Sequence, residues 1–116
     1  MRKKLQTSAG APGEFSRRVV ALALSVPKGR VTTYGDIARA AGGGTMASRS
    51  ITGILGAAWD KGEKKIPFHR IVYSGGRVWM SAQYEKERRA KYKKEGIVVD
   101  AKGRIENFRD ILFIFR

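Results

Sequence analysis

The sequence predicts a single domain of mixed helix and sheet, an α/β (α+β) fold. Apolar residues recur at helical spacing in the first half of the chain, and strand-like runs flank glycine turns in the second half. At 116 residues with 42% hydrophobic content, the chain is long enough to bury a core without disulfides or a metal ion. We expect residues 14–116 to form this domain and the small, polar and basic residues 1–13 to be a flexible tail.

A first amphipathic helix is expected from Glu14 to the residues just before Pro27. Its apolar side chains fall on one face: Phe15, Val19, Leu22 and Val26. Arg17 and Arg18 fall on the outer side, and Pro27 closes the segment because it lacks a backbone N–H. The pattern is typical of a surface helix that packs on a core.

The most regular part of the chain predicts a helix, a glycine turn and a second helix. Thr33 and Asp36 match a capping box, in which the threonine side chain accepts from the exposed amides of the first turn. The three glycines at 42–44 end this short helix and permit a tight turn. Thr45 is then placed to cap a second helix that runs to about Ala58.

The two sides of this second helix differ in bulk. One side is apolar and is expected to face the core: Ile51, Ile54, Leu55 and Ala58. The other side has a single long side chain among small ones: Thr45, Arg49, Gly53 and Gly56. Such a face lets the backbone approach another surface closely, which favours DNA contact. The alternative, that the glycines serve helix–helix packing, stays open.

Glycine turns predict two hairpins in the second half of the chain. Strand-like runs at 69–73 and 77–80 flank the turn at 74–76 and predict a short β-hairpin wing. A hairpin after a helix-turn-helix is the wing of a winged-helix domain, so we expect a winged-helix-like DNA-binding fold. A smaller hairpin is expected around the turn at 100–103.

Three further segments complete the chain. Residues 59–65 are expected to be a polar link, and residues 85–95 a charged helix closed by Gly96. This helix is strongly basic, and its side chains are as well explained by an ordinary solvated face as by phosphate contact: Lys86, Arg88, Arg89, Lys91, Lys93 and Lys94. The apolar residues 108–115 are expected to pack back on the core.

The net charge and the residue types present favour some classes of function and exclude others. Lys and Arg number 24 against 10 Asp and Glu, and the net charge of +14 favours a polyanionic partner such as nucleic acid. No bilayer-spanning run or signal peptide is evident, so we expect a soluble cytoplasmic protein without membrane contact. With no cysteine and one histidine, a thiol nucleophile is excluded and a conventional zinc site is not expected.

The histidine stands in an unusual stretch, residues 66–71, with the sequence Ile-Pro-Phe-His-Arg-Ile. Pro67 biases the residue before it toward an extended conformation, so the stretch indicates a loop that enters a strand. Taken alone, Phe68 and His69 are explained as a core aromatic and a structural histidine.

Three motifs in order change that interpretation. Residues 26–38, the turn that leads to Arg49, and residues 66–71 together resemble the DNA-binding domain of the alkylguanine-DNA alkyltransferases, over roughly residues 15–96. Those enzymes carry Pro-Cys-His-Arg, and the cysteine accepts the alkyl group from guanine. Phe68 stands at the cysteine position. An aromatic residue there, usually tryptophan, is typical of the alkyltransferase-like proteins, which bind the lesion without removing it.

The resemblance implies roles for individual residues. Tyr34 matches the residue that presses on the phosphate 3′ to a flipped nucleotide, and Arg49 matches the finger that fills the vacated place in the stack. His69 and Glu95 match the partners that activate the cysteine, so here they are expected to be structural or to orient the ligand. The family-motif positions are Pro67, Phe68, His69, Arg70 and Glu95.

Two sets of contact residues follow from the same resemblance. DNA contacts are expected from Thr33, Tyr34, Thr45, Arg49, Ser50 and Gly53. A lesion pocket is expected from Tyr34, Phe68, His69, Arg70, Trp79 and Ser81. Residues 79–83 would form part of its wall, without the arginine that some family members place there to contact the base.

The resemblance therefore implies a protein that flips O6-alkylguanine out of double-stranded DNA without alkyl transfer and marks it for nucleotide excision repair, and we expect it to be a monomer. No cofactor or metal is expected, and in a bacterium the protein would be nucleoid-associated. Two alternatives stay open: a winged-helix transcription regulator, and a glycosylase or hydrolase that uses His69 and Glu95 as acid and base. The regulator would prefer an operator sequence, whereas the enzyme would release product in a single-turnover assay.

Overall fold

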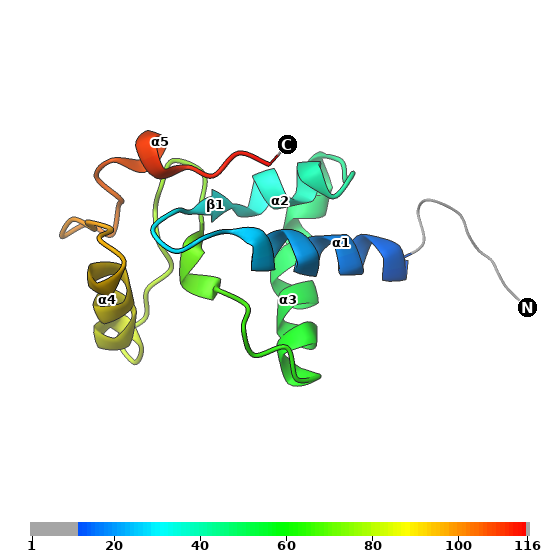
Figure 1. Cartoon of the computed structure of the whole chain (residues 1–116), viewed down its shortest axis with the longest axis horizontal. Helices are drawn as coiled ribbons and strands as arrows, with labels where there is room; N and C mark the ends of the chain where they lie inside the picture. The colour runs from blue at the N-terminus through cyan, green and yellow to red at the C-terminus, as the bar shows by residue number, and fades with distance from the viewer. Residues whose placement is uncertain (1–11, 116) are drawn as a thin grey trace, which may run out of the picture.

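The computed structural model describes residues 12–115, so most of the predicted tail lies outside the described residues. The elements in chain order are α1 (Pro12–Ser25), β1 (Thr32–Thr33), α2 (Tyr34–Ala40), the 3₁₀ helix η1 (Thr45–Ser50), α3 (Ile51–Asp60), the 3₁₀ helix η2 (Phe68–Arg70), β2 (Ile71–Val72), α4 (Glu85–Lys94) and α5 (Phe108–Ile111) (Figure 1). The predicted mixed fold class is confirmed. α1 begins at Pro12, ahead of the predicted Glu14, because proline is well tolerated in the first helical turn.

A two-stranded parallel sheet stands between the two hydrophobic cores of the molecule. β1 pairs with β2 so that Thr32 lies opposite Ile71 and Thr33 opposite Val72. Successive side chains of a strand point to opposite faces, so Ile71 enters one core and Val72 enters the other. The stretch around η2 and β2 is therefore anchored on both sides.

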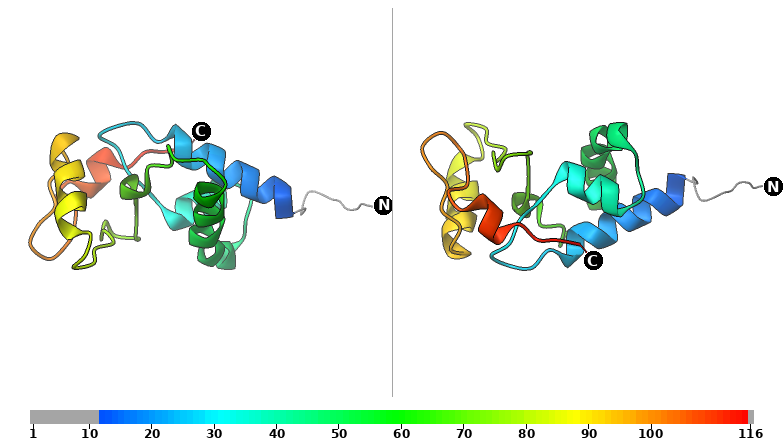
Figure 2. Two further views of the ribbon diagram at one scale, coloured as in Figure 1. Left: turned by 90° about the horizontal axis from the view of Figure 1, so that it is seen from below. Right: turned by 90° about the horizontal axis from the view of Figure 1, so that it is seen from above.

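The first core is built by α1, α2 and α3, and the second lies beneath α4 and the C-terminal segment. The first contains Val19, Ala23, Ile37, Ala38, Ala41, Ile51, Leu55, Ile66 and Ile71. The second contains Val31, Val72, Val78, Tyr92, Ile97 and Ile105. Two further views show α4 at the end of the molecule away from the start of α1, with η2 between α3 and α4 (Figure 2). Within the described residues, no helix has the length and apolar character needed to cross a bilayer.

The helix, glycine turn and helix form much as predicted. Thr33 Oγ1 accepts a hydrogen bond from the Asp36 amide at 3.0 Å, which confirms the predicted cap. The turn brings α1 and η1 close to Gly43, where a Cβ would lie 2.5 Å from the Cβ of Ala47 and 3.0 Å from the ring of Phe15. Only glycine permits this approach without displacing its neighbours.

The prediction that Thr45 caps an α-helix is wrong. Thr45 is instead the first residue of η1. The N-cap of η1 is Gly44, which provides no side-chain hydrogen bond. Ser50 Oγ donates to the Ala47 carbonyl at 2.8 Å, a local bond of the kind by which serine competes with regular helical pairing. α3 begins only after η1, and it continues to Asp60, so the link to η2 begins two residues later than predicted.

The predicted β-hairpin wing at 69–80 is also wrong. Its first run is divided between η2 and β2, and β2 pairs with β1. The chain does turn back after Tyr73, whose amide donates to the Arg77 carbonyl at 2.8 Å, but Arg77 forms its antiparallel bridge with Arg104. Pairing with distant segments thus satisfies backbone groups that a local hairpin would have used.

The smaller hairpin and the apolar tail form as predicted. Val99 bridges Ile105 in antiparallel sense around the turn at 100–103. After α5, the Phe113 amide donates to the Val31 carbonyl at 2.7 Å, so the tail runs beside the start of β1. The tail is therefore part of the packed domain.

Candidate functional site

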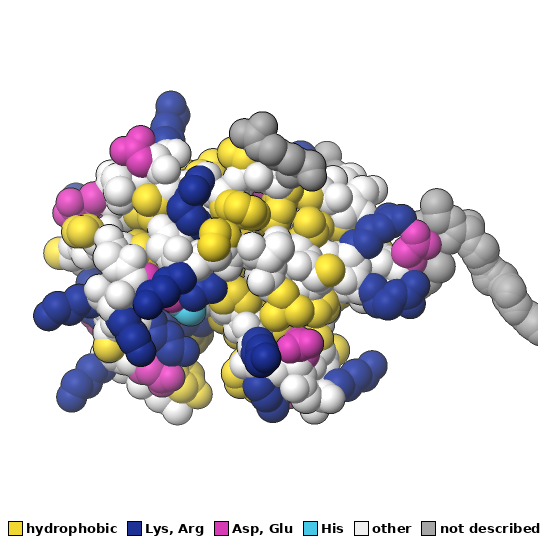
Figure 3. Space-filling model, in the orientation of Figure 1, with side chains coloured by type: hydrophobic (Ala, Val, Ile, Leu, Met, Phe, Trp, Pro, Cys, Tyr) yellow, Lys and Arg dark blue, Asp and Glu magenta, His cyan; other side chains and the backbone are white. Residues whose placement is uncertain are grey.

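A cavity of about 550 Å³ opens between the C-terminal end of α3 and α4, with η2 between them. In the space-filling view the surface is hollowed here, and Lys and Arg side chains stand on both sides of the hollow (Figure 3). We call this cavity the aromatic pocket. Its lining residues are Trp59, Lys64, Lys65, Ile66, Pro67, Phe68, His69, Arg70, Trp79, Tyr84, Glu87, Arg88 and Lys91.

One wall of the aromatic pocket is an aromatic pair from α3 and η2. Trp59, in the last turn of α3, meets Phe68 edge to face with ring centroids 5.5 Å apart and an interplanar angle of 63°. The Nζ of Lys64 lies 4.7 Å from the centroid of the Trp59 ring. Trp59 is 36% exposed, whereas Phe68 is half-buried against the first core. This wall therefore offers a fixed aromatic surface with a cation beside it.

A second wall, formed before and within α4, repeats this combination. The rings of Trp79 and Tyr84 are tilted by 37° with centroids 6.0 Å apart. The guanidinium carbon of Arg88, on α4, lies 5.0 Å from the centroid of the Trp79 ring. Arg88 thus brings an arginine to the pocket from α4, although the loop at 79–83 has none.

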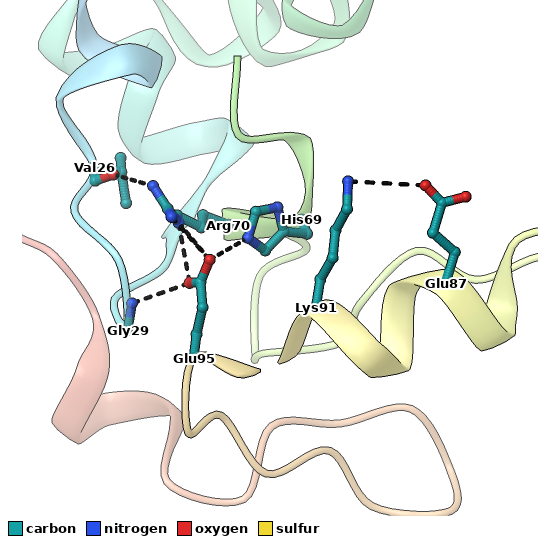
Figure 4. A network of polar contacts seen from close by, with 7 residues as sticks. All are labelled: Val26, Gly29, His69, Arg70, Glu87, Lys91 and Glu95. Carbon is teal, nitrogen blue, oxygen red and sulfur yellow. Dashed lines mark hydrogen bonds and ion pairs between the residues drawn. The ribbon is translucent and has the colours of Figure 1, made fainter. Parts of the chain in front are cut away.

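Beneath the pocket, the Glu95 carboxylate accepts hydrogen bonds from two other parts of the chain (Figure 4). Its carboxylate accepts from Arg70 Nε at 3.0 Å and Nη2 at 2.8 Å, from His69 Nε2 at 2.6 Å, and from the Gly29 amide at 3.0 Å. Arg70 Nη1 donates to the Val26 carbonyl at 3.0 Å. We call these five residues the Glu95 network. They join the segment after α1 to η2 and to the end of α4.

Electrostatics fixes the protonation states in the Glu95 network. Burial raises the pKa of Glu95, but hydrogen bonds from Arg70, Gly29 and His69 outweigh it and lower the pKa to about 2. Burial also lowers the pKa of His69, against the opposing effect of Glu95. At neutral pH we therefore assign an ionised Glu95 and a neutral His69 whose Nε2 carries the proton. Glu95 is the C-cap of α4, where the negative end of the helix dipole disfavours a carboxylate, and the positive charge of Arg70 compensates for this.

The structure brings together only part of the predicted lesion pocket. Phe68, His69, Arg70 and Trp79 line the aromatic pocket, whereas Tyr34 and Ser81 are not among its lining residues. Tyr34 packs on Tyr73 with ring centroids 5.6 Å apart, and burial raises the pKa of its hydroxyl.

The residues predicted to meet DNA lie mainly on η1 and the start of α3. Arg49, Ser50 and Gly53 are exposed, and they border a groove of about 810 Å³ between α1 and α3. A Cβ at Gly53 or Gly56 would meet no heavy atom within 4 Å beyond its own helix, so the alternative that these glycines serve helix packing is wrong. Thr33, in contrast, is only 7% exposed, and its hydroxyl is used to cap α2.

Comparison with known proteins agrees with this geometry. Residues 14–97 match the family model described as 6-O-methylguanine DNA methyltransferase, DNA binding domain. The chain belongs to this family. A DNA base-flipping protein of Escherichia coli is 32% identical over 92 residues, which cover 79% of this chain and 69% of that protein. A protein of the same name from Vibrio parahaemolyticus is also 32% identical, over 79% of this chain and 89% of its own length.

Solved structures of related proteins have a similar fold. S. pombe Atl1, in complex with damaged DNA containing O6-carboxymethylguanine, is 24% identical with a TM-score of 0.68, covering 87% of this chain and 95% of Atl1. An O6-methylguanine methyltransferase variant of M. tuberculosis is 24% identical with a TM-score of 0.54, covering 76% of this chain and 53% of that protein. These likenesses support the mixed fold of this family member.

Several lining residues of this family member were missed by sequence reasoning: Trp59, Lys64, Lys65, Tyr84, Glu87, Arg88 and Lys91. Residues 59–65 were expected to be only a polar link. A signal was nevertheless present there, because an aromatic residue followed by several lysines is typical of surfaces that stack on bases and attract phosphates. For α4 no local signal distinguishes the pocket-lining Arg88 from its basic neighbours.

Proposed function

We propose that this protein binds double-stranded DNA containing O6-alkylguanine and flips the altered nucleotide into the aromatic pocket. The observation that carries the proposal is the pair of aromatic walls, Trp59–Phe68 and Trp79–Tyr84, lining a single cavity. A base stacked on an aromatic side chain gains about 1–3 kcal/mol. Extruding a base costs a few kcal/mol, and least when alkylation has already weakened its pairing. The pocket can therefore favour the damaged base.

The face around Arg49 supports the flipping step. α3 contains ten residues and so spans about 15 Å, with Arg49 just before its start and Trp59 in its last turn. Flipping needs two separate groups, because one fills the vacated stack while another receives the base. The exposed Gly53 leaves the backbone of α3 free to approach a groove. Arg49 is therefore proposed as the intercalating finger.

Alkyl transfer is not part of the proposed function. Phe68 carries no nucleophilic atom, and the printed sequence has no cysteine. The enzyme alternative requires His69 and Glu95 to exchange protons. Glu95 is instead held ionised by Arg70, and its pKa of about 2 makes it a poor base at neutral pH. The Glu95 network is better explained as the support of η2.

The names of the relatives support damaged DNA as the ligand. The E. coli and Vibrio relatives are named as base-flipping proteins, and Atl1 was solved with damaged DNA. For the present chain we propose DNA with alkylated guanine as the ligand and nucleotide excision repair proteins as the recipients of the marked lesion. We also propose that it acts as a cytoplasmic monomer, associated with the nucleoid in a bacterium.

The direct test compares duplexes that are identical except for one O6-methylguanine, at a stated salt concentration, by fluorescence anisotropy. We expect tighter binding to the modified duplex and a flipping signal from a fluorescent base beside the lesion. Labelled methyl groups should remain on the DNA. Equal affinities would refute the proposal, and affinity that follows a particular base sequence would favour the transcription-regulator alternative.

A substitution pair tests the finger. Arg49→Ala should weaken binding to the modified duplex by about tenfold or more, because the cost of flipping is then less fully offset. Lys93→Ala, on the exposed part of α4, should remove one screened phosphate contact and reduce the salt slope by about 1. Equal losses for the two variants would contradict a finger at Arg49.

A further inference from the structure

The groove between α1 and α3 is larger than the aromatic pocket, with a volume of about 810 Å³ against about 550 Å³. It forms where α1 crosses α3 (Figure 1). Three of its lining residues are expected to meet DNA: Arg49, Ser50 and Gly53. The other lining residues have no role in the proposed function. We call this hollow the α1–α3 groove.

Apolar side chains from both helices line the α1–α3 groove: Val20, Ala21, Leu24, Ile54, Ala57 and Ala58. Leu24, in the last turn of α1, is 39% exposed, and Ala21 and Ala57 are also exposed. Single exposed apolar residues are normal on a protein surface, but a continuous apolar lining is typical of an interaction site. Because the alanines are small, the backbone of a ligand can approach closely.

The charged residues of the α1–α3 groove are all cations: Arg17 on α1, Arg49 on η1 and Lys61 at the end of α3. Among the described residues, 12–115, none of these three side chains forms an ion pair. Arg49 is assigned to DNA above, which leaves an unmatched cation on each helix, Arg17 and Lys61. An apolar lining with unmatched cations beside it is complementary to an apolar stripe that acidic side chains flank.

The length of the α1–α3 groove suits a short helix. The groove follows α3 from Ser50 to Lys61, which is about 16 Å at 1.5 Å per residue and matches about three helical turns. An amphipathic helix laid in a groove contacts it with apolar residues at i, i+3 or i+4, and i+7. A second copy of this chain is a poor occupant, because its net charge of +14 would oppose the cations of the groove.

We propose that the α1–α3 groove binds an acidic amphipathic helix of a partner protein. Its apolar stripe would lie on the apolar lining, and its acidic side chains would face Arg17 and Lys61. Trp59 lines the aromatic pocket and Ala57 lines the groove, roughly 160° apart around α3. The two sites therefore open on different sides of one helix, so a partner helix can be bound while the aromatic pocket is occupied.

The test uses a fluorescent, helix-stapled peptide with leucine at i, i+4, i+7 and i+11 and glutamate on both sides of this stripe. The staple is needed because isolated helices of about 14 residues are marginal in water. Control peptides carry glutamine or lysine in place of glutamate. Anisotropy titrations of the whole protein without DNA should give a micromolar dissociation constant for the acidic peptide, with about tenfold weaker binding of the lysine peptide. No saturable binding, or equal binding of these two peptides, would overturn the inference and leave the proposed function untouched.

Substitutions locate the peptide. Leu24→Gln should weaken the acidic and glutamine peptides alike, by about fivefold or more, because an apolar contact is lost. Arg17→Gln and Lys61→Gln, at exposed positions, should each weaken only the acidic peptide, by about two- to fivefold. Lys102→Gln is the matched control, because it removes the same charge from an exposed turn outside the groove. If the Arg17 and Lys61 variants behave like this control, the peptide does not lie in the groove and the inference fails.

Two further measurements distinguish the other possible occupants, DNA and a second copy of the chain. Leu24→Gln should bind the O6-methylguanine duplex as the wild-type protein does, and sedimentation velocity should show a monomer for both. A loss of duplex binding as large as the loss of peptide binding would make the groove a DNA contact. A wild-type dimer that Leu24→Gln dissociates would make a second copy the occupant. Either result would overturn the inference.

Discussion

The aromatic pocket and the Glu95 network share His69 and Arg70 of η2 but differ in the environment of their charged groups. In the network, the Glu95 side chain is 7% exposed, and Arg70 and His69 both donate to its carboxylate. In the pocket, Trp59 and Trp79 are 36% and 37% exposed, and the cations beside them rest on rings. Two lining residues of η2 thus differ in role: Phe68 packs beside Trp59 in the pocket wall, whereas Arg70 pairs with Glu95 beneath the pocket.

This difference teaches which residues can be changed without unfolding the protein. A buried charge that loses its partner is costly because the remaining charge is desolvated and uncompensated. A half-exposed ring or cation can be changed at a smaller cost, because solvent replaces the lost contact. Substitutions in the network should therefore act on stability, and substitutions in the pocket should act on binding.

The largest effect is expected from Arg70→Leu. It leaves Glu95 buried without its cation, so the free energy of unfolding should fall by about 3–5 kcal/mol. Urea denaturation at pH 7 measures the loss. The double variant with Glu95→Gln should be more stable than Arg70→Leu alone, because the uncompensated charge is gone. If the double variant is the less stable of the two, the burial of the charge is not the cause.

The pH dependence of stability gives the next largest effect. Glu95 has a folded pKa of about 2 against an ordinary value of 4.5, so its contribution is present above pH 4.5 and is lost as the pH falls to about 2. The folded pKa of His69 also lies below its ordinary value of 6.5. The stability contributed by neutral His69 is therefore lost as the pH falls below 6.5. Because of these two groups, the unfolded chain binds more protons than the folded chain in this pH range. Stability therefore falls on acidification.

Glu95→Gln isolates the carboxylate in this measurement. Between pH 5 and pH 2, the wild-type protein should lose up to about 3 kcal/mol more unfolding free energy than the variant. Denaturation at several pH values gives both curves. Parallel curves would show that Glu95 titrates alike in the folded and unfolded chains.

Phe68 tests the pocket side of the comparison. Phe68→Leu keeps an apolar side chain against the first core but removes the ring face. Binding to the O6-methylguanine duplex should therefore weaken by about 1–3 kcal/mol, with a smaller change for undamaged DNA. Phe68→Trp should preserve or tighten lesion binding if the half-buried site admits the larger ring.

Thermal melting distinguishes stacking from a purely structural role of Phe68. Phe68→Leu should melt close to the wild-type temperature, because its apolar contacts with Ile66 and the rest of the first core are largely kept. A large melting loss with an unchanged preference for the lesion would make Phe68 a core residue only.

The smallest effect is expected from Glu87→Gln. Glu87 and Lys91 form an exposed pair at 3.9 Å, so stability should change by less than about 0.5 kcal/mol. Removing the acidic residue from the pocket lining should modestly increase affinity for the O6-methylguanine duplex, because a charge that repels phosphates is gone. Anisotropy titrations with this duplex measure the change. If Glu87→Gln changes the unfolding free energy as much as Arg70→Leu does, pocket residues affect stability as strongly as network residues, which contradicts the comparison.

The sequence by itself determined the properties that depend on neighbouring residues. The cap at Thr33, the glycine turn and the core face with Ile51 and Leu55 could be predicted, because capping and helical periodicity involve residues within one or two turns. The positive charge and the lack of a thiol could be read directly. The position of Phe68 in the family motif also came from the sequence.

Only the tertiary structure decided how distant residues combine. Trp59 meets Phe68 across the link between α3 and η2, Arg88 reaches Trp79 from α4, and Arg70 pairs with Glu95 from 25 residues away. The pairing of β2 with β1 replaced the local hairpin for the same reason. A local pattern reports what a residue can contact within its own element. Which elements meet depends on how the two cores pack, and that packing placed the cations on the pocket walls.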